Sequence, residues 1–542
     1  MQKVLLIGIV MIIFVLPIFT SAATYYIDST EGNDDNDGLS PTTAWKTITK
    51  VNNELSARTF KPGDSILFKR GDKWTSGNNL QITQGGATDQ PLTIGAYGTG
   101  NKPVFYGGTH IICTTDGIGY ITVQDIRVEK AGTGSSLYFR ANNMNNITIS
   151  RVEVIGSEQN AIFLASVSGY LIEDCYVDYA ANSGIVIYGS TTTPPINNGI
   201  IRNNLIEGSG GNDCFTLHKD GNGNDIGSHH LLIKNVGHNC GEQAFDITAG
   251  KDIILRDNEG YDNADSSIII GHSAENVWID RFYSHDERQM GIIITEAINS
   301  KVTNSIFYKA GYHQIQVGSA SGTVNTEIYN NIFVHGPDST GSILDISYPT
   351  TNKVVFKNNI IMSMQYDQPA RYVRYLGGAT PNNTNSVFSN NIWWRPDGAA
   401  TGDNRMWYDG TDVHTFDWWQ TLYPTEKLAD PQVVDITNGN LKLQSTSPAI
   451  DTGANTGLTY DFENNPRPQG SAPDIGAYEY QGSAPPVCAA ADINCDTRVD
   501  ISDLILITRD FGKTSGYNLK ADTDSNGIID IFDIVYVASR FT

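Results

Sequence analysis

The feature that most constrains the fold is an irregular repeat that runs from about Gly117 to Asn391, with units mostly 21 to 32 residues long. Each unit has an alternating apolar strand, a polar turn, a second short apolar strand and another turn. Strands this short cannot form a self-sufficient hairpin core, but units stacked coil on coil bury one continuous apolar column. The repeat therefore predicts an all-β parallel β-helix, and it leaves the handedness open.

The strands and turns of this repeat recur at recognisable positions. The first strands begin at Tyr120, Asn146, His230, Asp252, Asn276 and Lys353, and the second strands at Ala161, Gly184, Cys214, Ala244, Ser267, Gly291 and Gln314. Pairs of asparagines follow several first strands, at 203–204, 330–331, 358–359 and 390–391. Asparagine tolerates left-handed backbone and can bond to a neighbouring coil, so these turns suit a solenoid.

A solenoid needs covered ends, because an open edge would pair with other chains. The segment from Thr43 to Leu55 has helical apolar spacing and predicts a cap at the N-terminal end. After Asn391 the repeat fades into a stretch with five tryptophans, namely Trp393, Trp394, Trp407, Trp418 and Trp419. A second cap is favoured for them over a sugar-stacking surface.

Residues 1–23 are typical of a secretory signal peptide. Lys3 supplies the positive start, Val4 to Ile18 is a short apolar run, and small residues end the segment. A membrane anchor is the alternative, but the run is short for a spanning helix. We expect a secreted protein that is free of the membrane after signal cleavage.

The net charge and the number of cysteines limit which partners and which kinds of fold are compatible with the chain. With 36 basic and 59 acidic residues the net charge is −23, which argues against nucleic acid and does not favour an unassisted polyanionic substrate. Six cysteines in so long a chain are not a disulfide framework. A bridge between Cys488 and Cys495 is plausible, and the other four are predicted to be small buried residues: Cys113, Cys175, Cys214 and Cys240.

The C-terminal fifty residues contain two loops with the spacing of a calcium site. Oxygen-bearing side chains stand at loop positions 1, 3, 5, 9 and 12 of both, and position 7 would offer its backbone carbonyl. The predicted ligands are Asp492, Asn494, Asp496, Arg498, Asp500 and Asp503 in the first loop, and Asp522, Asp524, Asn526, Ile528, Asp530 and Asp533 in the second. Each loop leads into an apolar-faced helix, predicted over 504–511 and 534–541.

On these loops, residues 488–542 resemble a type I dockerin, a duplicated loop-helix module that binds cohesin domains. Aspartate at position 12 fits that pattern, whereas Thr497 departs from the usual glycine at position 6. The resemblance implies two bound Ca²⁺ ions and a cohesin partner on a scaffold or surface protein. Positions 10 and 11, which usually contribute to cohesin choice, are Ile501-Ser502 and Ile531-Phe532. They are unequal and partly apolar, so an unusual partner or a contact within this chain stays open.

The region 24–480 resembles the secreted right-handed parallel β-helix proteins that include polysaccharide lyases and some glycoside hydrolases. The resemblance outside the repeat rests on the stretches from Tyr25 to Ile48, from Lys61 to Phe68, from Ser447 to Gly453 and from Asp474 to Tyr480. We divide the chain into a signal peptide (1–23), a cap with the first coils (24–116), the β-helix (117–400), its C-terminal cap (401–480), a linker (481–487) and the dockerin-like module (488–542).

Polar residues crowd the coils between Asp213 and Glu296. Aligned second strands place Glu242 between Asn212 and Asp265 in one column, and Asn239, Asp262 and Asp286 in another. His238 and His285 occupy matched places two coils apart. A third column contains Lys219, His272 and Glu296. Asp246 is predicted to point outward from its strand. Neighbouring coils lie about 4.8 Å apart, near the roughly 5–5.5 Å that separates the carboxyl groups of retaining glycosidases.

Two reactions remain open. Hydrolysis needs a carboxyl pair, for which Glu242 with Asp265, or Asp262 with Asp286, would serve. β-Elimination on a uronate polymer needs a base such as Lys219 or Arg288, with a third calcium on the aspartates at 262, 265 and 286. The usual Asp-Asp-Gly turn of β-helix pectate lyases is absent from the turn at 241–246, which puts that activity in doubt.

We expect a carbohydrate-active enzyme that cleaves glycosidic bonds of a polysaccharide, with hydrolysis favoured because carboxylates are abundant and no basic groove is evident. His272, Glu296 and Asp246 are the predicted substrate-binding residues. A non-catalytic glycan-binding or scaffold solenoid is the alternative, since the fold hosts both.

Overall fold

The computed structural model describes most of the chain. The described ranges are 22–75, 79–114, 117–130, 132–189, 197–272, 274–318, 325–347, 353–364, 372–376, 386–395, 405–408, 413–482, 491–494, 498–514, 518–523 and 526–541. The predicted signal peptide up to residue 21, most of the predicted linker, and Cys488 and Cys495 lie outside them. A helix with the length and apolarity of a membrane span does not occur in these ranges.

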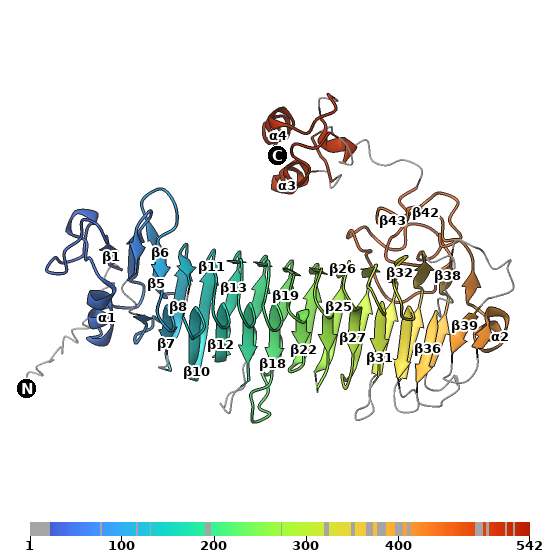
Figure 1. Ribbon diagram of the computed structural model, residues 1–542, viewed down its shortest axis with the longest axis horizontal. Helices are drawn as coiled ribbons and strands as arrows, with labels where there is room; N and C mark the ends of the chain where they lie inside the picture. Colours follow the sequence, from blue (N-terminus) through green and yellow to red (C-terminus); the bar gives the residue numbers. More distant parts are fainter. Residues whose placement is uncertain are drawn as a thin grey trace, which may run out of the picture.

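The chain winds into a parallel β-helix with three strands in each regular coil (Figure 1). One coil consists of β22 (Lys251–Arg256), β23 (Glu259–Tyr261) and β24 (Ser266–Ile270), and the next repeats it with β25 (Glu275–Asp280), β26 (Tyr283–His285) and β27 (Met290–Ile294). Each strand pairs in parallel with the strand one coil later. The strands that align with β22, β23 and β24 are called faces 1, 2 and 3.

The remaining strands extend these faces over the whole solenoid. Face 1 also contains β1 (Thr24–Ile27), β2 (Ser65–Lys69), β5 (Leu92–Tyr97), β8 (Gly119–Gln124), β13 (Leu171–Glu173), β16 (Ile200–Arg202), β19 (Leu231–Ile233), β28 (Ser300–Thr303), β31 (Asn325–Tyr329), β34 (Lys353–Lys357) and β37 (Ser386–Ser389). Face 2 also contains β3 (Lys73–Trp74), β6 (Val104–Tyr106), β9 (Arg127–Glu129), β11 (Glu153–Ile155), β14 (Tyr176–Val177), β17 (Leu205–Ile206), β20 (Val236–His238), β29 (Ile306–Tyr308), β32 (Ile332–His335), β35 (Ile360–Ser363), β38 (Ile392–Trp394) and β41 (Lys427–Leu428). Face 3 also contains β4 (Leu80–Gln81), β7 (Ile112–Thr114), β12 (Ile162–Ser168), β15 (Ile185–Tyr188), β18 (Phe215–His218), β21 (Gln243–Ile247), β30 (Ile315–Val317), β33 (Leu344–Ser347), β36 (Val373–Leu376) and β39 (Arg405–Tyr408), to which β40 (Val413–Thr415) is antiparallel. The long β10 (Leu137–Ser150) contributes to faces 3 and 1 in turn.

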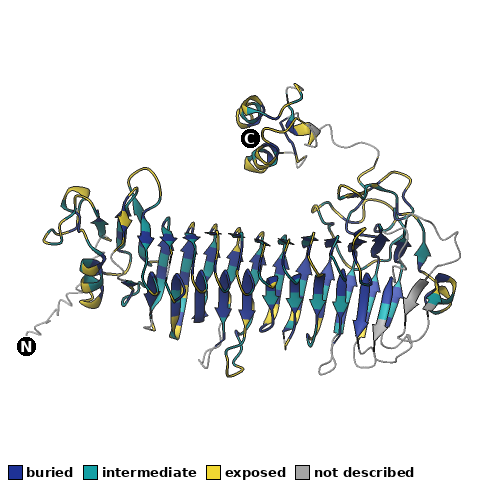
Figure 2. Ribbon diagram, in the orientation of Figure 1, coloured by how far each residue is buried: buried dark blue, intermediate teal, exposed yellow. Residues whose placement is uncertain are grey.

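The core is the interior column that the short strands predicted. Inward side chains stack on their counterparts in the next coil, as Phe215 does on Phe245 with ring centroids 4.8 Å apart, and Phe307 on Phe333 at 5.2 Å. The strands are mainly buried, whereas exposed residues gather at the turns (Figure 2). The parallel β-helix prediction is confirmed.

The asparagine pairs have two distinct roles. The first member of each pair takes left-handed backbone, with φ between 54° and 57° at residues 203, 330, 358 and 390. The second is buried and accepts from the backbone N–H one coil earlier. Asn331 Nδ2 donates to Asn359 Oδ1 (3.0 Å), and Asn359 Nδ2 donates to Asn391 Oδ1 (3.0 Å). Such a ladder satisfies the turn backbone where water is excluded.

Both ends of the solenoid have a helix; a helical cap was predicted for the N-terminal end, and a tryptophan-rich cap without a stated helix for the other. At the N-terminal end, α1 (Ile48–Ser56) begins at Ile48 because the Thr47 side chain accepts from the Lys50 N–H, so the predicted start at Thr43 was wrong and Trp45 lies outside the helix. The short 3₁₀ helix η1 (Pro41–Thr43) ends where the predicted helix was to begin, and residues 44–47 are not helical. At the other end is α2 (Phe416–Leu422), and Trp393 and Trp419 are buried in the core as cap residues. The Trp407 side chain lies outside the described residues.

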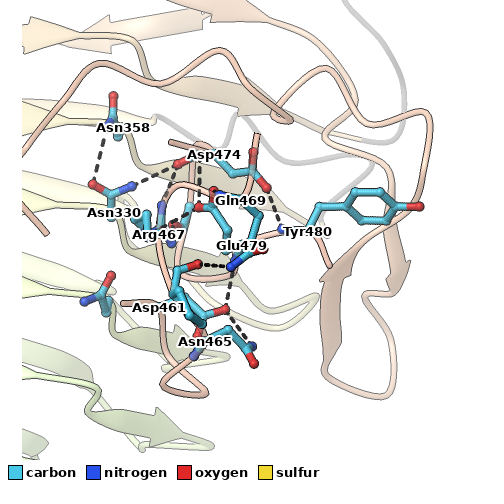
Figure 3. A network of polar contacts seen from close by, with 12 residues as sticks. Asn330, Asn358, Asp461, Asn465, Arg467, Gln469, Asp474, Glu479 and Tyr480 are labelled. Carbon is cyan, nitrogen blue, oxygen red and sulfur yellow. Dashed lines mark hydrogen bonds and ion pairs between the residues drawn. The ribbon is translucent and has the colours of Figure 1, made fainter. Parts of the chain in front are cut away.

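A wing made by residues 430–482 folds back along face 2 and does not lie over the end of the solenoid (Figure 1). It contains β42 (Val433–Asp435) and β43 (Asn440–Leu443), and its apolar residues cover β29, β32 and β35. Polar contacts fix the wing, since Asn330 Nδ2 donates to Asp474 O and the buried Arg467 donates to the carbonyls of Asp474 and Gly476 (Figure 3). The Arg467 guanidinium also forms an ion pair with Glu479.

The C-terminal module has α3 (Ile501–Arg509), the 3₁₀ helix η3 (Leu519–Ala521) and α4 (Ile531–Ala538). Both long helices begin three residues before the predicted starts. Asp500 and Asp530 cap them, and the aspartates three residues later bond back to complete a capping box in each. The two helices share a small apolar core that includes Ile507, Ile529 and Val537.

The cysteine prediction needs one correction. Cys214 and Cys240 form a disulfide, with Cα atoms 5.6 Å apart, because the turn before β21 brings Cys240 beside the start of β18 one coil earlier. Cys113 and Cys175 are buried and free, as predicted.

Candidate active site

The predicted columns are confirmed by the strand register. The Glu242 N–H donates to Asn212 O (3.2 Å) and the Asp265 N–H donates to Glu242 O (3.1 Å), so these three turn residues align. His238 pairs with Tyr261 and Tyr261 with His285, which places residues 239, 262 and 286 in the next column. The register says nothing about chemical roles, which remain predictions.

The third column lies at the opposite end of the face 3 strands. Continuing the register from β18 through β21 and β24 aligns Lys219, Ala249, His272 and Glu296. His272 Nδ1 lies 3.4 Å from Glu296 Oε2. Lys219 is half-buried and its carbonyl accepts from His218 Nδ1 (2.7 Å).

Several of the predicted catalytic residues stand in solvent. Glu242, Asp262, Asp286 and Arg288 are exposed, whereas Asp265 is half-buried and accepts from Gln243 Nε2 (2.6 Å). Among the residues described here, no three His, Cys, Asp or Glu side chains gather as a metal site, so the aspartates at 262, 265 and 286 are not brought together as a calcium cage.

The structure instead brings two other carboxyl groups together on face 3. Asp213 immediately precedes β18, and Asp246 projects outward from β21 in the next coil, as predicted for Asp246. Asp246 is the register partner of Thr216, and Thr216 Oγ1 lies 3.3 Å from Asp213 Oδ2. Thr216 therefore stands between the two carboxyl groups.

Asp213 is only 1 % exposed and is held from several directions. Its Oδ1 accepts from the Gln243 N–H (3.1 Å). In the orientation that satisfies its neighbours, the Asn212 amide donates to Asp213 Oδ2 (2.9 Å) and to Glu242 Oε2 (3.3 Å). The predicted residue Glu242 therefore belongs to the rim of this site.

Asp246 Oδ1 is buried and accepts no hydrogen bond from the described residues. Unlike Asp213, whose two oxygens have partners, Asp246 keeps a lone-pair site free. A buried carboxyl oxygen without a donor is costly for a structural residue, and such costs concentrate at functional sites.

Both carboxyl groups titrate far above their usual range. Burial, with the neighbouring Asp246 and Glu242, raises the pKa of Asp213 to about 8. Burial raises the pKa of Asp246 to about 7, with a further contribution from Glu242. Two acids that share a desolvated site and cannot both ionise at neutral pH form the arrangement that acid–base catalysis needs.

Other buried carboxyl groups with raised pKa values have structural explanations. Burial raises the pKa of Glu287 to about 7, but Glu287 accepts from both nitrogens of Asn263 and ends an asparagine ladder. Glu426 likewise ends the ladder at Asn391. Asp213 and Asp246 differ because neither ends an asparagine ladder: Asp246 points outward from β21, and Asp213, itself buried, accepts from the outward-facing Thr216.

Sequence reasoning overlooked Asp213 because it compared residues within one column. In its own column Asp213 aligns with Ser183, Gln243 and Ser266, which are not acidic. Its contact with Asp246 runs diagonally, through Thr216. The signal in the sequence is an acidic residue directly before an apolar strand, with a second acid inside the corresponding strand of the next unit.

The two predicted calcium loops are described only in part, since Asp496 and Asp524 lie outside the described residues. The buried position-12 side chains close each loop. Asp503 Oδ1 accepts from the Ile493 and Asn494 N–H groups, and Asp533 Oδ1 from the Thr523 N–H. This closure brings positions 1 to 3 near position 12, a chain path that fits a hard cation.

A family model and a curated relative each match part of the chain. The family model "Right handed beta helix region" matches residues 137–280. The chain is 32 % identical over 145 residues to a lacto-N-biosidase of Bifidobacterium longum subsp. longum, a match that covers 26 % of this chain and 8 % of the relative. The chain thus spans less than a tenth of the length of that relative.

Two solved structures resemble the chain at low identity and with TM-scores below 0.5. The native GH136 lacto-N-biosidase from Eubacterium ramulus superposes with a TM-score of 0.44 at 14 % identity, covering 68 % of each chain. The A-module of the mannuronan C-5 epimerase AlgE6 of Azotobacter vinelandii superposes with a TM-score of 0.46 at 13 % identity, covering 71 % of this chain and 96 % of that one.

Proposed function

We propose that the chain is a carbohydrate-active enzyme that hydrolyses glycosidic bonds, with Asp213 and Asp246 as its carboxyl pair. The observation that supports this proposal most directly is the pair of neighbouring carboxyl groups. Two outward-facing acids on consecutive coils are desolvated together, so that one is held protonated while the other can ionise. The local similarity to a lacto-N-biosidase supports the glycosidase class.

The different surroundings of Asp213 and Asp246 indicate which carboxyl group is the acid and which is the nucleophile or base. Asp213 is the more deeply buried acid and has the higher pKa, so it is suited to donate a proton to the leaving glycosidic oxygen. Asp246, with its free Oδ1, is suited to act as the nucleophile or to activate water.

The first test is to incubate the mature chain with neutral and acidic polysaccharides, following new reducing ends and the ultraviolet absorbance of unsaturated uronides. Reducing ends without absorbance are expected. Absorbance together with reducing ends would overturn hydrolysis in favour of β-elimination and direct attention to Lys219 and Arg288. Neither signal across the panel would favour a non-catalytic glycan-binding solenoid.

We also propose that the protein is exported and that residues 488–542 are a calcium-binding, dockerin-like module that docks to a cohesin. The paired capping boxes and the closure of each loop by Asp503 or Asp533 support this. The exposed Ile501, Ile531 and Phe532, at positions 10 and 11, offer an apolar contact surface. Bound Ca²⁺ would neutralise the loop carboxylates.

Calorimetric titration of the full chain with Ca²⁺ tests this module. Two binding events are expected in the wild type and one in the Asp533→Ala variant. Hydrogen exchange of α3 and α4 is expected to rise when a chelator is added. Identical exchange with and without chelator would contradict the calcium assignment.

A further inference from the structure

A row of aromatic rings runs along the outer surface of face 3. His110 stacks on Tyr138 with centroids 4.3 Å apart, Tyr138 stacks on Phe163 at 5.3 Å, and Phe163 leads to Tyr188 at 5.7 Å. Tyr188 stacks on His218 at 6.3 Å. We call these five residues the aromatic strip.

The strip is outside the core. In β12 the side chains of Ile162 and Leu164 belong to the interior column, so Phe163 and Ala165 point outward. Together with Val186, and with Tyr138 and Tyr188 packed against them, they form an apolar cluster separate from the core. The cluster is not needed to fill the interior column. Phe163, Ala165 and Val186 are themselves buried and support the strip from below, whereas Tyr138 and Tyr188 are half-buried and His218 is exposed, so these three rings offer accessible parts of the strip.

The strip is continuous with the carboxyl pair. Tyr138, Phe163, Val186, Thr216 and Asp246 are successive register partners in one outward column. In the neighbouring column Tyr188 is the register partner of His218, which lies on β18, the strand that Asp213 precedes. The strip therefore ends at the coil of Asp213, one coil before Asp246.

The last ring of the strip, the imidazole of His218, has a polar edge. His218 is exposed, and its Nδ1 lies 2.7 Å from Lys219 O. Because a carbonyl only accepts, Nδ1 carries the hydrogen and Nε2 is left to bond a ligand. Tyr138 and Tyr188 also combine an apolar ring with a polar group, which in their case is a hydroxyl.

We propose that the aromatic strip is the binding platform for a neutral, extended glycan chain that lies parallel to the solenoid axis and enters the carboxyl pair beside His218. This inference rests on the proposed function and names its substrate class. Sugars present apolar C–H surfaces and hydroxyl edges, which match aromatic rings that carry polar atoms. The rings recur about once per coil, or roughly every 4.8 Å, so several sugar units can be held at once.

Charge favours a neutral chain. The net charge of the protein is −23, and the site next to the strip contains Asp213, Asp246 and Glu242. Arg140, which donates to the Tyr138 hydroxyl (3.5 Å), and Lys219, which follows His218, lie beside the strip, but two basic side chains do not make the extended basic groove that a polyuronate needs next to these carboxyl groups.

The test separates binding from catalysis. In the full-length Asp213→Asn/Asp246→Asn protein, calorimetry would measure binding of tri- and hexasaccharides of xylan, cellulose, mannan and β-1,3-glucan, with hexagalacturonate for comparison. At least one neutral series is expected to bind, the hexasaccharide about 10-fold or more tighter than the trisaccharide. Tyr138→Ala and Tyr188→Ala should each weaken the hexasaccharide about 3- to 10-fold.

Tyr106→Ala is the matched control, because Tyr106 lies on β6 of face 2, away from the strip. The affinity of this variant for the hexasaccharide should equal that of the Asp213→Asn/Asp246→Asn protein in which it is made. The proposal is overturned if no neutral series binds, if only hexagalacturonate binds, or if the strip variants bind as tightly as Tyr106→Ala. If the double variant binds longer chains more tightly but the wild type cleaves nothing, the strip is a glycan platform and the proposed hydrolysis is rejected. If the wild type cleaves a glycan but the strip variants bind it as well as the control does, hydrolysis is upheld and the platform is rejected.

Discussion

Asp246 stands one coil beyond Thr216 in exact strand register, and the Thr216 hydroxyl lies 3.3 Å from Asp213 Oδ2. The parallel pairing of β18 with β21 thus fixes the position of Asp246 relative to Thr216, and through Thr216 relative to Asp213 at the start of β18. A solenoid is suited to this task because every strand is fixed by parallel pairing to both neighbours.

Replacing either acid by its amide should abolish most of the activity. Asp213→Asn and Asp246→Asn are each expected to lower kcat by about 10²- to 10⁴-fold, since each removes a proton-transfer or nucleophilic group. Initial rates on the best substrate of the panel would measure the loss. Asp252→Asn, an exposed change at the start of β22 on face 1, is the control and should retain wild-type rates. Unchanged rates in both amide variants would reject the pair.

The activity should have a bell-shaped pH dependence. The reaction requires one acid protonated and the other ionised, so kcat/KM should rise as pH increases towards about 7, where Asp246 ionises, and fall above about 8, where Asp213 ionises. Rates measured from pH 5 to 10 would show the two limbs. A plateau through pH 9 would show that Asp213 is not the acid.

The same pKa values make a prediction about stability. The folded-state pKa of Asp213 is raised above its unfolded value near 3.8, so the folded protein keeps a proton that the unfolded chain has lost. The stability that this group contributes is therefore full below pH 4 and falls as the pH rises towards about 8. Asp213→Asn should unfold at nearly the wild-type temperature at pH 4 and should gain at least about 1 kcal/mol at pH 9. Equal melting temperatures at pH 9 would contradict the burial of a charge at this position.

The disulfide should position Asp213 as well as stabilise the fold. Cys214 follows Asp213 directly, and Cys240 belongs to the turn before Gln243, whose N–H donates to Asp213. The Cys214→Ala/Cys240→Ala protein should lose about 2–4 kcal/mol of unfolding free energy, and its alkaline activity limb should move to lower pH as water reaches Asp213. Cys113→Ala, at a buried free thiol, is the control. A lower melting temperature with an unmoved pH limb would show a purely structural bridge.

The solenoid was predictable from sequence because its determinants are local and repeated. Alternation sets the strands, and asparagine pairs such as Asn358-Asn359 set the turns in several coils. The helix starts were missed by a few residues because caps at Thr47, Asp500 and Asp530 override the apolar spacing. The carboxyl pair and the disulfide depend on diagonal contacts between coils. Columns of aligned residues do not reveal these, because the direction of a side chain decides them.

The asparagine ladder should carry a large share of the stability of the C-terminal coils. Asn359 accepts from the N–H and the side chain of Asn331, and donates to Ile328 O and to Asn391 Oδ1. Asn359→Ala removes all four bonds and leaves buried groups without partners, at about 1–3 kcal/mol for each such group. Chemical denaturation should show the loss, and hydrogen exchange should locate it at β32, β35 and β38. Asn325→Ala is the control, because the Asn325 side chain donates only to the exposed Asn299. If both variants unfold alike, the ladder is not a principal source of stability and the stacked apolar column holds these coils alone.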